Sequence, residues 1–179
     1  MKKNYKEYDP EILRKLQMTQ VEILKDFISI CQKYDLDYFL LGGSGIGVIR
    51  HQGFIPWDDD VDVAMPRRHY EVLLNAVEQE MGDRYEILTP LKEERYACNV
   101  THMQKKGTRF VPENSKNLKC DLGISIDIFP LDHVPEDKKK RRSQLKRTWF
   151  LSKLLYLCGT PTPIIPLQGS KKVVASAIC

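Results

Sequence analysis

Carboxylates alternate with β-branched side chains in the segment Asp60-Val61-Asp62-Val63. Alternate residues of a strand point to the same face, so this pattern predicts a strand that directs Val61 and Val63 into a core. The other face would carry Asp58, Asp60 and Asp62. Carboxylates held this close repel one another unless a cation neutralises them, and oxygen ligands favour Mg²⁺ or Mn²⁺. The alternative is a solvated acidic turn at the start of a strand.

A second apolar segment, Ile124–Phe129, contains the single carboxylate Asp127. Aspartate is disfavoured inside strands and is rarely buried without a partner. If this strand lies beside the first, Asp127 completes a cluster with Asp60 and Asp62 that could hold one or two metal ions. Alternatively, Asp127 forms a buried ion pair with an arginine or a lysine.

The small residues Gly42-Gly43-Ser44 lie between an apolar run and a predicted helix. Small residues allow backbone amides to approach a phosphate, and the dipole at a helix N-terminus favours an anion. A glycine pair is also ordinary loop geometry. Next to the carboxylates, Gly43 and Ser44 are interpreted as a phosphate-binding turn that faces a metal site.

Five more side chains are candidates for substrate contact. Arg50 could clamp a phosphate or form a surface salt bridge, and His51 could act in acid–base catalysis or orient its loop. Trp57 could stack on a nucleobase or pack against the start of the strand. Lys105 and Arg109 could neutralise a donor diphosphate or be solvated charges near a turn.

The periodicity of apolar residues mixes helices and strands without a regular β-α-β alternation, which predicts the α+β class. We expect one domain, because 179 residues can bury most of their apolar surface in a single core. The expected helices are Pro10 to about Tyr34, Ser44–Arg50, Tyr70–Met81 and about Glu136–Leu157. The expected strands are a buried one at Tyr38–Leu41, then Asp60–Val63, Tyr85–Leu88, Ala97–Gln104, Thr108–Val111 and Ile124–Phe129.

The positive charge of the chain is concentrated. Its formal net charge is +4, yet residues 138–153 alone contain eight basic residues and no acidic one. This composition does not indicate a nucleic-acid-binding protein, because the rest of the chain is net acidic. The segment contains Trp149 and several leucines, so it predicts either a basic amphipathic helix on an anionic membrane or a core helix with a solvated start.

The five cysteines are odd in number and never form a CxxC motif, which predicts buried thiols in the reducing cytoplasm. A zinc site at Cys98, His102 and Cys120 is the less favoured alternative, since the spacing matches no zinc signature. The N-terminus lacks the apolar core of a signal peptide, and no apolar run is long enough to span a bilayer. We therefore expect a cytoplasmic protein that contacts the inner face of the membrane peripherally.

Two stretches of the sequence resemble a known family. GGSGIGVIRHQGFIPWDDDVDVAMPRRHYEVL and GISIDIFPLD are similar to LicD-type phosphotransferases, over residues 36–135. The resemblance implies a nucleotidyltransferase-like mixed β-sheet flanked by helices, with a catalytic core in residues 1–135. Residues 136–179 would form the basic helix and a proline-containing tail, interpreted as the start of a C-terminal region. One departure is Gly43–Gly47, where the family has a Gly-Thr-Leu-Leu-Gly-like run.

The resemblance also implies an activity. Such enzymes transfer phosphocholine from CDP-choline to cell-surface glycans such as teichoic acid or lipopolysaccharide, and they are related to ribitol-phosphate transferases. Asp60 and Asp62 would bind Mg²⁺ or Mn²⁺ with Asp127 as the third carboxylate, and Gly43 and Ser44 would touch the diphosphate. The partners would be a CDP-linked alcohol and a glycan acceptor. The alternatives are transfer of the nucleotide itself to an alcohol, or an inactive module that binds a nucleotide or a metal.

Overall fold

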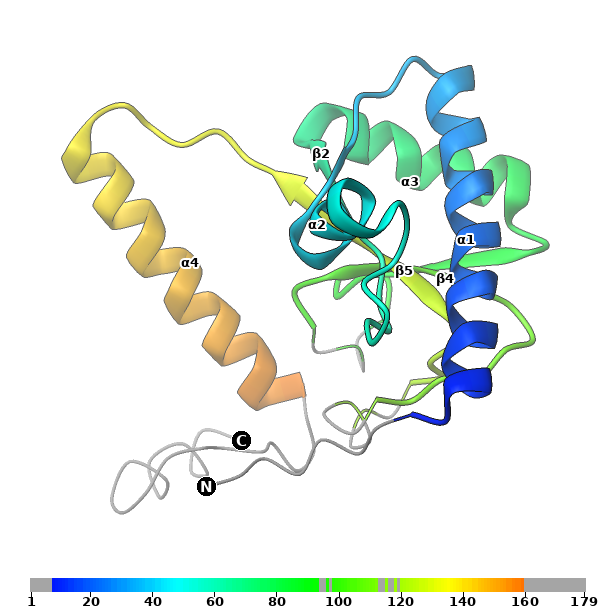
Figure 1. Ribbon diagram of the computed structural model, residues 1–179. Helices are drawn as coiled ribbons and strands as arrows, with labels where there is room; N and C mark the ends of the chain where they lie inside the picture. The colour runs from blue at the N-terminus through cyan, green and yellow to red at the C-terminus, as the bar shows by residue number, and fades with distance from the viewer. Residues whose placement is uncertain are drawn as a thin grey trace.

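The computed structural model describes residues 8–93, 96, 98–112, 115, 118 and 120–159, with the side chains of residues 156–159 excepted. Helices and strands follow one another along the chain without a regular alternation, so the α+β class is confirmed (Figure 1). The helices are α1 (Pro10–Lys33), α2 (Gly42–His51), α3 (Arg67–Met81) and α4 (Lys138–Gly159). The strands are β1 (Phe39–Leu40), β2 (Asp62–Pro66), β3 (Tyr85–Leu88), β4 (Thr101–Lys105) and β5 (Ser125–Leu131).

The strands form one mixed sheet in the order β1-β2-β5-β4-β3. β2 and β5 run parallel, whereas β1 with β2, β5 with β4 and β4 with β3 are antiparallel pairs. Strand β5, the last in the described part of the chain, therefore occupies the centre of the sheet. Its backbone pairing with β2 is what brings the two acidic segments of the chain side by side.

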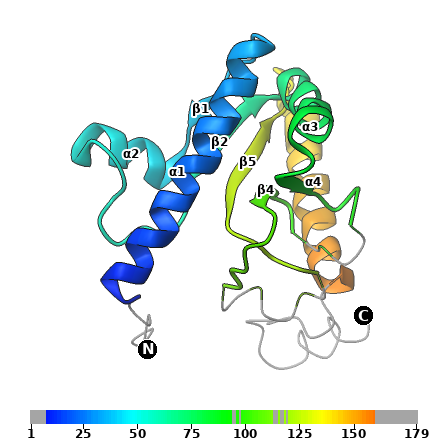
Figure 2. The same cartoon turned by 90° about the vertical axis from the view of Figure 1, so that its right-hand side faces the viewer.

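Helices α1 and α3 cover one face of the sheet and form the main core with it (Figures 1 and 2). Each fully buried aliphatic side chain there contributes roughly 1.5–3 kcal/mol. The strand residues that point into this core are Val63, Met65, Met103, Ile126 and Ile128, each with no exposed surface. The predicted direction of Val61 and Val63 is confirmed, since 4% and 0% of these residues are exposed.

Local sequence signals predicted the ends of several elements correctly. The Asp9 side chain caps α1 by accepting hydrogen bonds from the backbone N–H groups of Glu11 and Ile12 at 2.9 and 3.3 Å. Pro10 occupies the first helical position, as expected from its fixed φ and missing N–H. β3 has the predicted bounds, and α2, α3 and α4 differ from the predicted helices by a few residues.

Two strand predictions are wrong. The run Tyr38–Leu41 forms only the two-residue edge strand β1, and Phe39, in register with Ala64 on the face away from the main core, is 56% exposed. Residues 108–111 form no strand, and Phe110 N–H donates a single backbone hydrogen bond to the carbonyl of Leu122. β4 begins at Thr101 rather than at residue 97, which lies outside the described residues.

Helix α4 does not pack into the core, contrary to one of the two alternatives. Leu145 and Trp149 are 62% and 66% exposed, and Phe150 and Leu151 are each 59% exposed. These apolar residues lie on several sides of the helix, because successive residues are rotated by about 100°. The helix therefore has no single apolar face, and the prediction of an amphipathic helix is wrong. Most of its cations lie in its first half and most of its apolar residues in its second half. Figure 1 shows α4 standing apart from the sheet.

No helix in the part of the chain that the structure describes combines the length and the apolar character needed to cross a bilayer.

Candidate active site

One row of side chains crosses the sheet on the face opposite the α1–α3 core. Asp62 of β2 pairs in register with Asp127 of β5, which pairs with His102 of β4, which pairs with Leu88 of β3. Residues in register on neighbouring strands point to the same face and lie about 5 Å apart. The backbone N–H of Asp127 also donates to the carbonyl of Val61 at 2.8 Å. The predicted neighbourhood of Asp62 and Asp127 is thus present.

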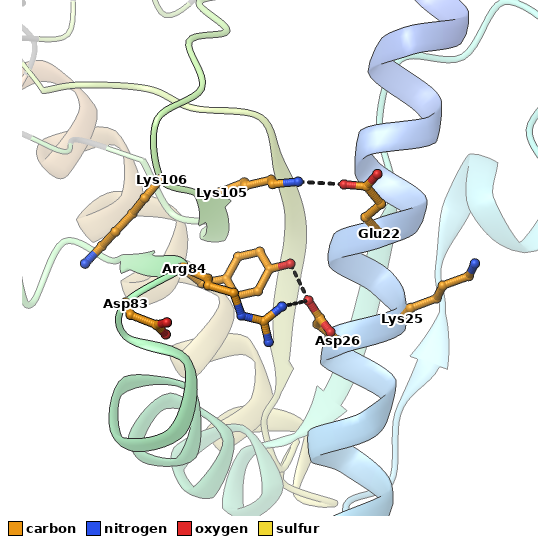
Figure 3. A pocket seen from close by; sticks show the side chains of 8 residues that line it. Glu22, Lys25, Asp26, Asp83, Arg84, Lys105 and Lys106 are labelled. Carbon is orange, nitrogen blue, oxygen red and sulfur yellow. Dashed lines mark hydrogen bonds and ion pairs between the residues drawn. The ribbon is translucent and has the colours of Figure 1, made fainter.

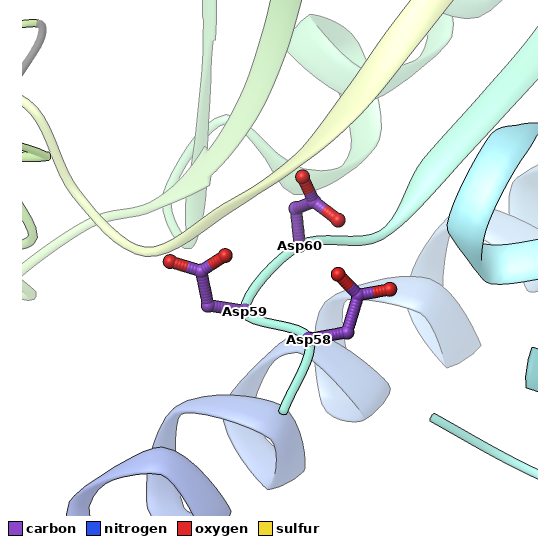
Figure 4. Close-up of side chains that lie close together, drawn as sticks. All are labelled: Asp58, Asp59 and Asp60. Atoms are coloured by element: carbon purple, nitrogen blue, oxygen red, sulfur yellow. The ribbon is translucent and has the colours of Figure 1, made fainter. Parts of the chain in front are cut away.

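An acidic loop, defined as Asp58, Asp59 and Asp60, leads into this row. The predicted strand begins two residues later than expected, because β2 starts at Asp62 and Asp60 belongs to the loop before it. Each of the three loop residues offers a carboxylate oxygen, and these oxygens lie within 4.8 Å of one another (Figure 4). Among the described residues, no other group of three or more acidic, histidine or cysteine side chains converges as closely, so the predicted set of Asp60, Asp62 and Asp127 does not come together to this extent.

The row and the acidic loop are electrostatically coupled through Asp60. Partial burial, together with repulsion first from Asp62 and then from Asp58 and Asp59, raises the pKa of Asp60 to about 6. Burial and repulsion from Asp62 and Asp60 raise the pKa of Asp127 to about 7. The pKa of Asp62 is also raised, by burial and by Asp58. These carboxylates repel one another when they are all ionised. A hard divalent cation bound to their oxygens would neutralise this repulsion.

Asp127 does not form the alternative ion pair with a buried arginine or lysine. The Nε2 atom of His102 lies 3.3 Å from its Oδ1 atom, and 19% of the His102 side chain and 25% of the Asp127 side chain are exposed. Burial lowers the pKa of His102 to about 4, so this imidazole is neutral at pH 7. The contact therefore leaves the acidic charge of the row uncompensated.

Two buried glutamines of α1 hold the acidic loop in place. The Nε2 atom of Gln17 donates to the carbonyl of Asp58 at 2.9 Å. The Nε2 atom of Gln20 donates to the carbonyls of Asp59 at 2.9 Å and of Ser125 at 3.3 Å. Sequence reasoning missed both residues. The available signal was a pair of amides three residues apart on the otherwise apolar face of a helix.

Replacing Gln20 with alanine is expected to lower the free energy of unfolding by about 2–3 kcal/mol. The substitution leaves two buried backbone carbonyls without their side-chain donor and opens a small cavity. Urea denaturation would measure the loss. Gln32→Ala, at an exposed position of the same helix, is the matched control and should change stability by less than about 0.5 kcal/mol. Equal losses in both variants would contradict the anchoring role.

The N-terminus of α2 faces the same carboxylates. Gly42 has a φ of +55°, and a Cβ atom there would lie 3.3 Å from Oδ2 of Asp62. A Cβ atom at Gly43 would lie 2.6 Å from Oδ2 of Asp58, so only glycine allows this approach without a shift. The Oγ atom of Ser44 accepts a hydrogen bond from the backbone N–H of Asp62 at 2.9 Å. The structure therefore brings Gly43 and Ser44 to the acidic region, as predicted.

The amides of this first helical turn are not capped by a side chain. Leu41 occupies the N-cap position and its apolar side chain makes no capping hydrogen bond. The first N–H groups of a helix have no partner within the helix and carry its positive dipole. This end of α2, which lies beside several carboxylates, has free backbone N–H groups that could donate hydrogen bonds to a phosphate.

Three predicted residues lie near the site without entering the row. Arg50 and His51 occupy the last turn of α2 and are exposed. Arg50 is roughly 9 Å along the helix axis from Ser44, at a rise of 1.5 Å per residue. Trp57 directly precedes the acidic loop and is 76% exposed, so the prediction that it packs against the start of the strand is wrong. An exposed indole beside the carboxylates is compatible with the alternative, stacking on a ligand ring.

Lys105 lies on the other face of the sheet. His102 and Lys105 are three residues apart on β4, so their side chains point in opposite directions. The Nζ atom of Lys105 lies 2.6 Å from Oε2 of Glu22, in a groove between α1 and β3 (Figure 3). In the same groove, Arg84 donates to Asp26 at 2.7 Å. Lys105 is therefore separated from the carboxylates by the sheet itself.

Arg109 is exposed on the loop after β4 and lines a different hollow. The zinc alternative is not supported among the described residues, since Cys98 and Cys120 do not converge with His102. Cys98 and Cys120 are partly buried around Tyr96 and form no disulfide. His102 faces Asp127 instead. Of the thiols that the structure describes, Cys31 is fully buried, as predicted.

The fold and this site define an α+β protein with carboxylates on two parallel strands and an uncapped helix N-terminus beside them. The chain belongs to the LicD/FKTN/FKRP family, because the family's nucleotidyltransferase-domain model matches residues 35–155. The match continues beyond residue 135 into α4.

A curated relative carries the name of this family. The chain is 36% identical over 155 residues to the lipopolysaccharide cholinephosphotransferase LicD of Haemophilus influenzae, an alignment that covers 79% of this chain and 57% of that protein. The chain thus spans a little over half the length of this relative. It is also 30% identical over 71 residues to an uncharacterised protein of Rickettsia typhi, which covers 38% of this chain and 23% of the relative.

Proposed function

We propose that this chain carries the active site of a metal-dependent enzyme that transfers a phospho-alcohol, such as phosphocholine, from a CDP-linked donor to a hydroxyl of a cell-surface glycan. The observation that carries the proposal is the in-register pair of Asp62 and Asp127 on parallel strands, with Asp60 beside it. The family and the name of the Haemophilus relative support the choice of donor group and a lipopolysaccharide-like acceptor.

The carboxylates of Asp60, Asp62 and Asp127 would hold Mg²⁺ or Mn²⁺. Their mutual repulsion and raised pKa values fit a site built for a cation. When bound, the ion would neutralise the phosphates of the donor and stabilise the charge that develops on the leaving group. Asp58 lies close enough to Asp60 to complete the set, since their oxygens lie within 4.8 Å.

The first turn of α2 would bind the donor diphosphate. The backbone N–H groups of Gly43 and Ser44 would donate to phosphate oxygens, and the helix dipole would favour the anion. Ser44 also fixes Asp62, because its Oγ atom accepts the Asp62 N–H at 2.9 Å. One short turn thus links the phosphate-binding and carboxylate parts of the site. Trp57, exposed beside the acidic loop, would stack on the cytosine ring.

In the transfer, the oxygen of the acceptor hydroxyl attacks the phosphorus that carries the alcohol. The bond from this phosphorus to the bridging oxygen of the diphosphate breaks, and CMP leaves with the electron pair. Asp127 orients the hydroxyl and takes its proton. A cation in the site would lower the pKa of Asp127 from about 7, its value in the metal-free protein, and so keep this carboxylate ionised and able to accept the proton.

Product analysis tests the proposal. The chain would be incubated with Mg²⁺ or Mn²⁺, a panel of CDP-alcohols and candidate glycans, and the released nucleotide would be identified. Release of CMP together with a phosphorylated glycan supports phospho-alcohol transfer. Transfer of the nucleotide itself is the second candidate, favoured by the nucleotidyltransferase description of the matched domain. That reaction would start from a nucleoside triphosphate and release pyrophosphate. Neither product, with folded protein and bound metal, would reject both.

We also expect α4 to hold the enzyme loosely at anionic membranes, where lipid-linked or membrane-anchored glycans are found. Eight cations and no acid lie in residues 138–153, and Trp149 is 66% exposed. Each cation near an anionic surface contributes on the order of 1 kcal/mol, and salt screens this attraction. Co-sedimentation with anionic and neutral vesicles across a salt series measures the effect.

A charge-reversed pair of variants sharpens this experiment. Lys146→Glu with Arg147→Glu should reduce sedimentation with anionic vesicles several-fold. Lys15→Glu with Lys25→Glu on α1 makes the same change in net charge and should reduce it much less. Equal partitioning to both vesicle types, or no sedimentation at low salt, would rule out the membrane contact.

A further inference from the structure

His102 is the one polar member of the cross-sheet row for which the proposed reaction has no role. It lies on β4 in register with Asp127, and its Nε2 atom is 3.3 Å from the Asp127 Oδ1 atom. The two side chains are 19% and 25% exposed, so solvent reaches this contact only partly. On this face of the sheet, Asp127 lies between Asp62 on β2 and His102 on β4.

The surroundings hold the imidazole in a fixed position. The Tyr96 ring packs against it at a centroid distance of 5.3 Å and an interplanar angle of 66°. Tyr96 is itself 1% exposed, and its hydroxyl donates to the carbonyl of Val100 at 2.7 Å. Leu88 stands beyond His102 in the same row and packs against Tyr96. A ring fixed on two sides can impose its orientation on a carboxylate.

We propose that His102 is the positioning residue for Asp127. A hydrogen bond from Nε2–H to Oδ1 of Asp127, across the 3.3 Å that separates the two atoms, would direct the other carboxylate oxygen towards Asp62 and Asp60. The inference rests on the proposed function, since it assigns Asp127 to the metal site. Hydrogen bonds to the ligands of a metal fix their orientation, and their loss typically lowers metal affinity 10–100-fold.

Mn²⁺ binding, measured by electron paramagnetic resonance on the complete chain, tests this role without requiring turnover. His102→Phe keeps a flat ring against Tyr96 but has no donor, and it should weaken Mn²⁺ binding about tenfold or more. His102→Gln places an amide N–H near the position of Nε2 and should bind Mn²⁺ within about threefold of the parent. His133→Phe, in the exposed loop after β5, is the matched control and should bind normally.

A shorter amide separates positioning from packing. The side chain of His102→Asn does not reach Asp127, so this variant should lose affinity as His102→Phe does. The Gln and Asn variants alone decide the question if the Phe variant fails to fold. The proposal is overturned if His102→Phe binds Mn²⁺ as tightly as the parent, or if Gln and Asn lose affinity equally.

The same experiment separates this inference from the proposed transfer. Mn²⁺ binding that depends on Asp127 and His102, without any release of CMP, would reject the transfer and keep the positioning role. Asp127→Asn that binds Mn²⁺ as tightly as the parent would overturn the positioning role together with the assigned metal site.

Discussion

Asp62→Asn is expected to abolish transfer, a loss of at least about 10³-fold, while the protein remains folded. The side chain would be one of three carboxylates around the cation, and contacts that stabilise developing charge commonly carry effects of this size. The substitution leaves the backbone hydrogen bond from residue 62 to Ser44 in place. It also removes a carboxylate whose pKa is raised by burial and by Asp58, so the repulsion in the metal-free site decreases.

The free energy of unfolding of the metal-free variant should therefore stay unchanged or rise by up to about 1 kcal/mol. Release of CMP and urea denaturation in EDTA are the two measurements. Asp83→Asn, at the turn between α3 and β3, makes the same chemical change away from the acidic row and should retain activity. A folded Asp62→Asn variant with near-normal turnover would contradict the role of Asp62.

Asp127→Asn is expected to stabilise the metal-free protein increasingly as the pH rises from about 4 to about 7. The carboxyl group has a pKa of about 7 in the folded protein and 3.8 as its ordinary value. Within this window the folded state keeps a proton that the unfolded chain releases, so this group makes the parent less stable as the pH rises. The variant lacks this loss, and its advantage should approach about 4 kcal/mol above pH 7.

The comparison with the variant is needed because His102 has the opposite effect on the parent. Its pKa is lowered from 6.5 to about 4 by burial, so the unfolded chain binds the extra proton and stability rises with pH through this range. Both proteins contain His102, and its contribution cancels to first order in the difference. Parallel stability curves for the parent and for Asp127→Asn would contradict the raised pKa.

Mg²⁺ or Mn²⁺ should offset much of this pH-dependent loss of stability in the parent, but not in Asp127→Asn. A cation at 100 times its dissociation constant adds about 2.7 kcal/mol to the stability of a protein that binds it only when folded. The gain should be largest above pH 7 and small at pH 5, where protons compete for Asp127 and Asp60. Equal gains in the parent and in Asp127→Asn would place the cation elsewhere.

Much of the fold could be predicted because the signals were local. The proline and cap at the start of α1, the periodicity of α3 and the alternation in β3 each lie within one element. Burial was predicted less well. β1 looked like a buried strand from its composition, yet its place at the edge of the sheet follows from pairing with distant residues. The same is true of α4: its apolar residues allowed a position in the core, but they are exposed in the described structure.

The candidate site divides in the same way. The alternation of polar and apolar residues predicted that Asp62 and Asp127 each point away from the core. Only the order of the strands in the sheet makes them neighbours. The side of the sheet occupied by Lys105 depends on where β4 begins and ends, which the sequence did not define. Gln17 and Gln20 were missed, and His102 was considered only as a zinc ligand, because the contacts of all three are with residues far away in the sequence.

The position of β5 has a consequence for how the protein folds. As the last strand that the structure describes, it must insert between β2 and β4, so this sheet cannot form completely before residue 131 is available. Until then, β2 and β4 present unpaired edges and apolar side chains such as Met65 and Met103, which are features of aggregation-prone intermediates. Such non-local pairing also slows folding. The cross-sheet row is complete only when β5 has joined the sheet. A cation should therefore bind there only after this last pairing step has taken place.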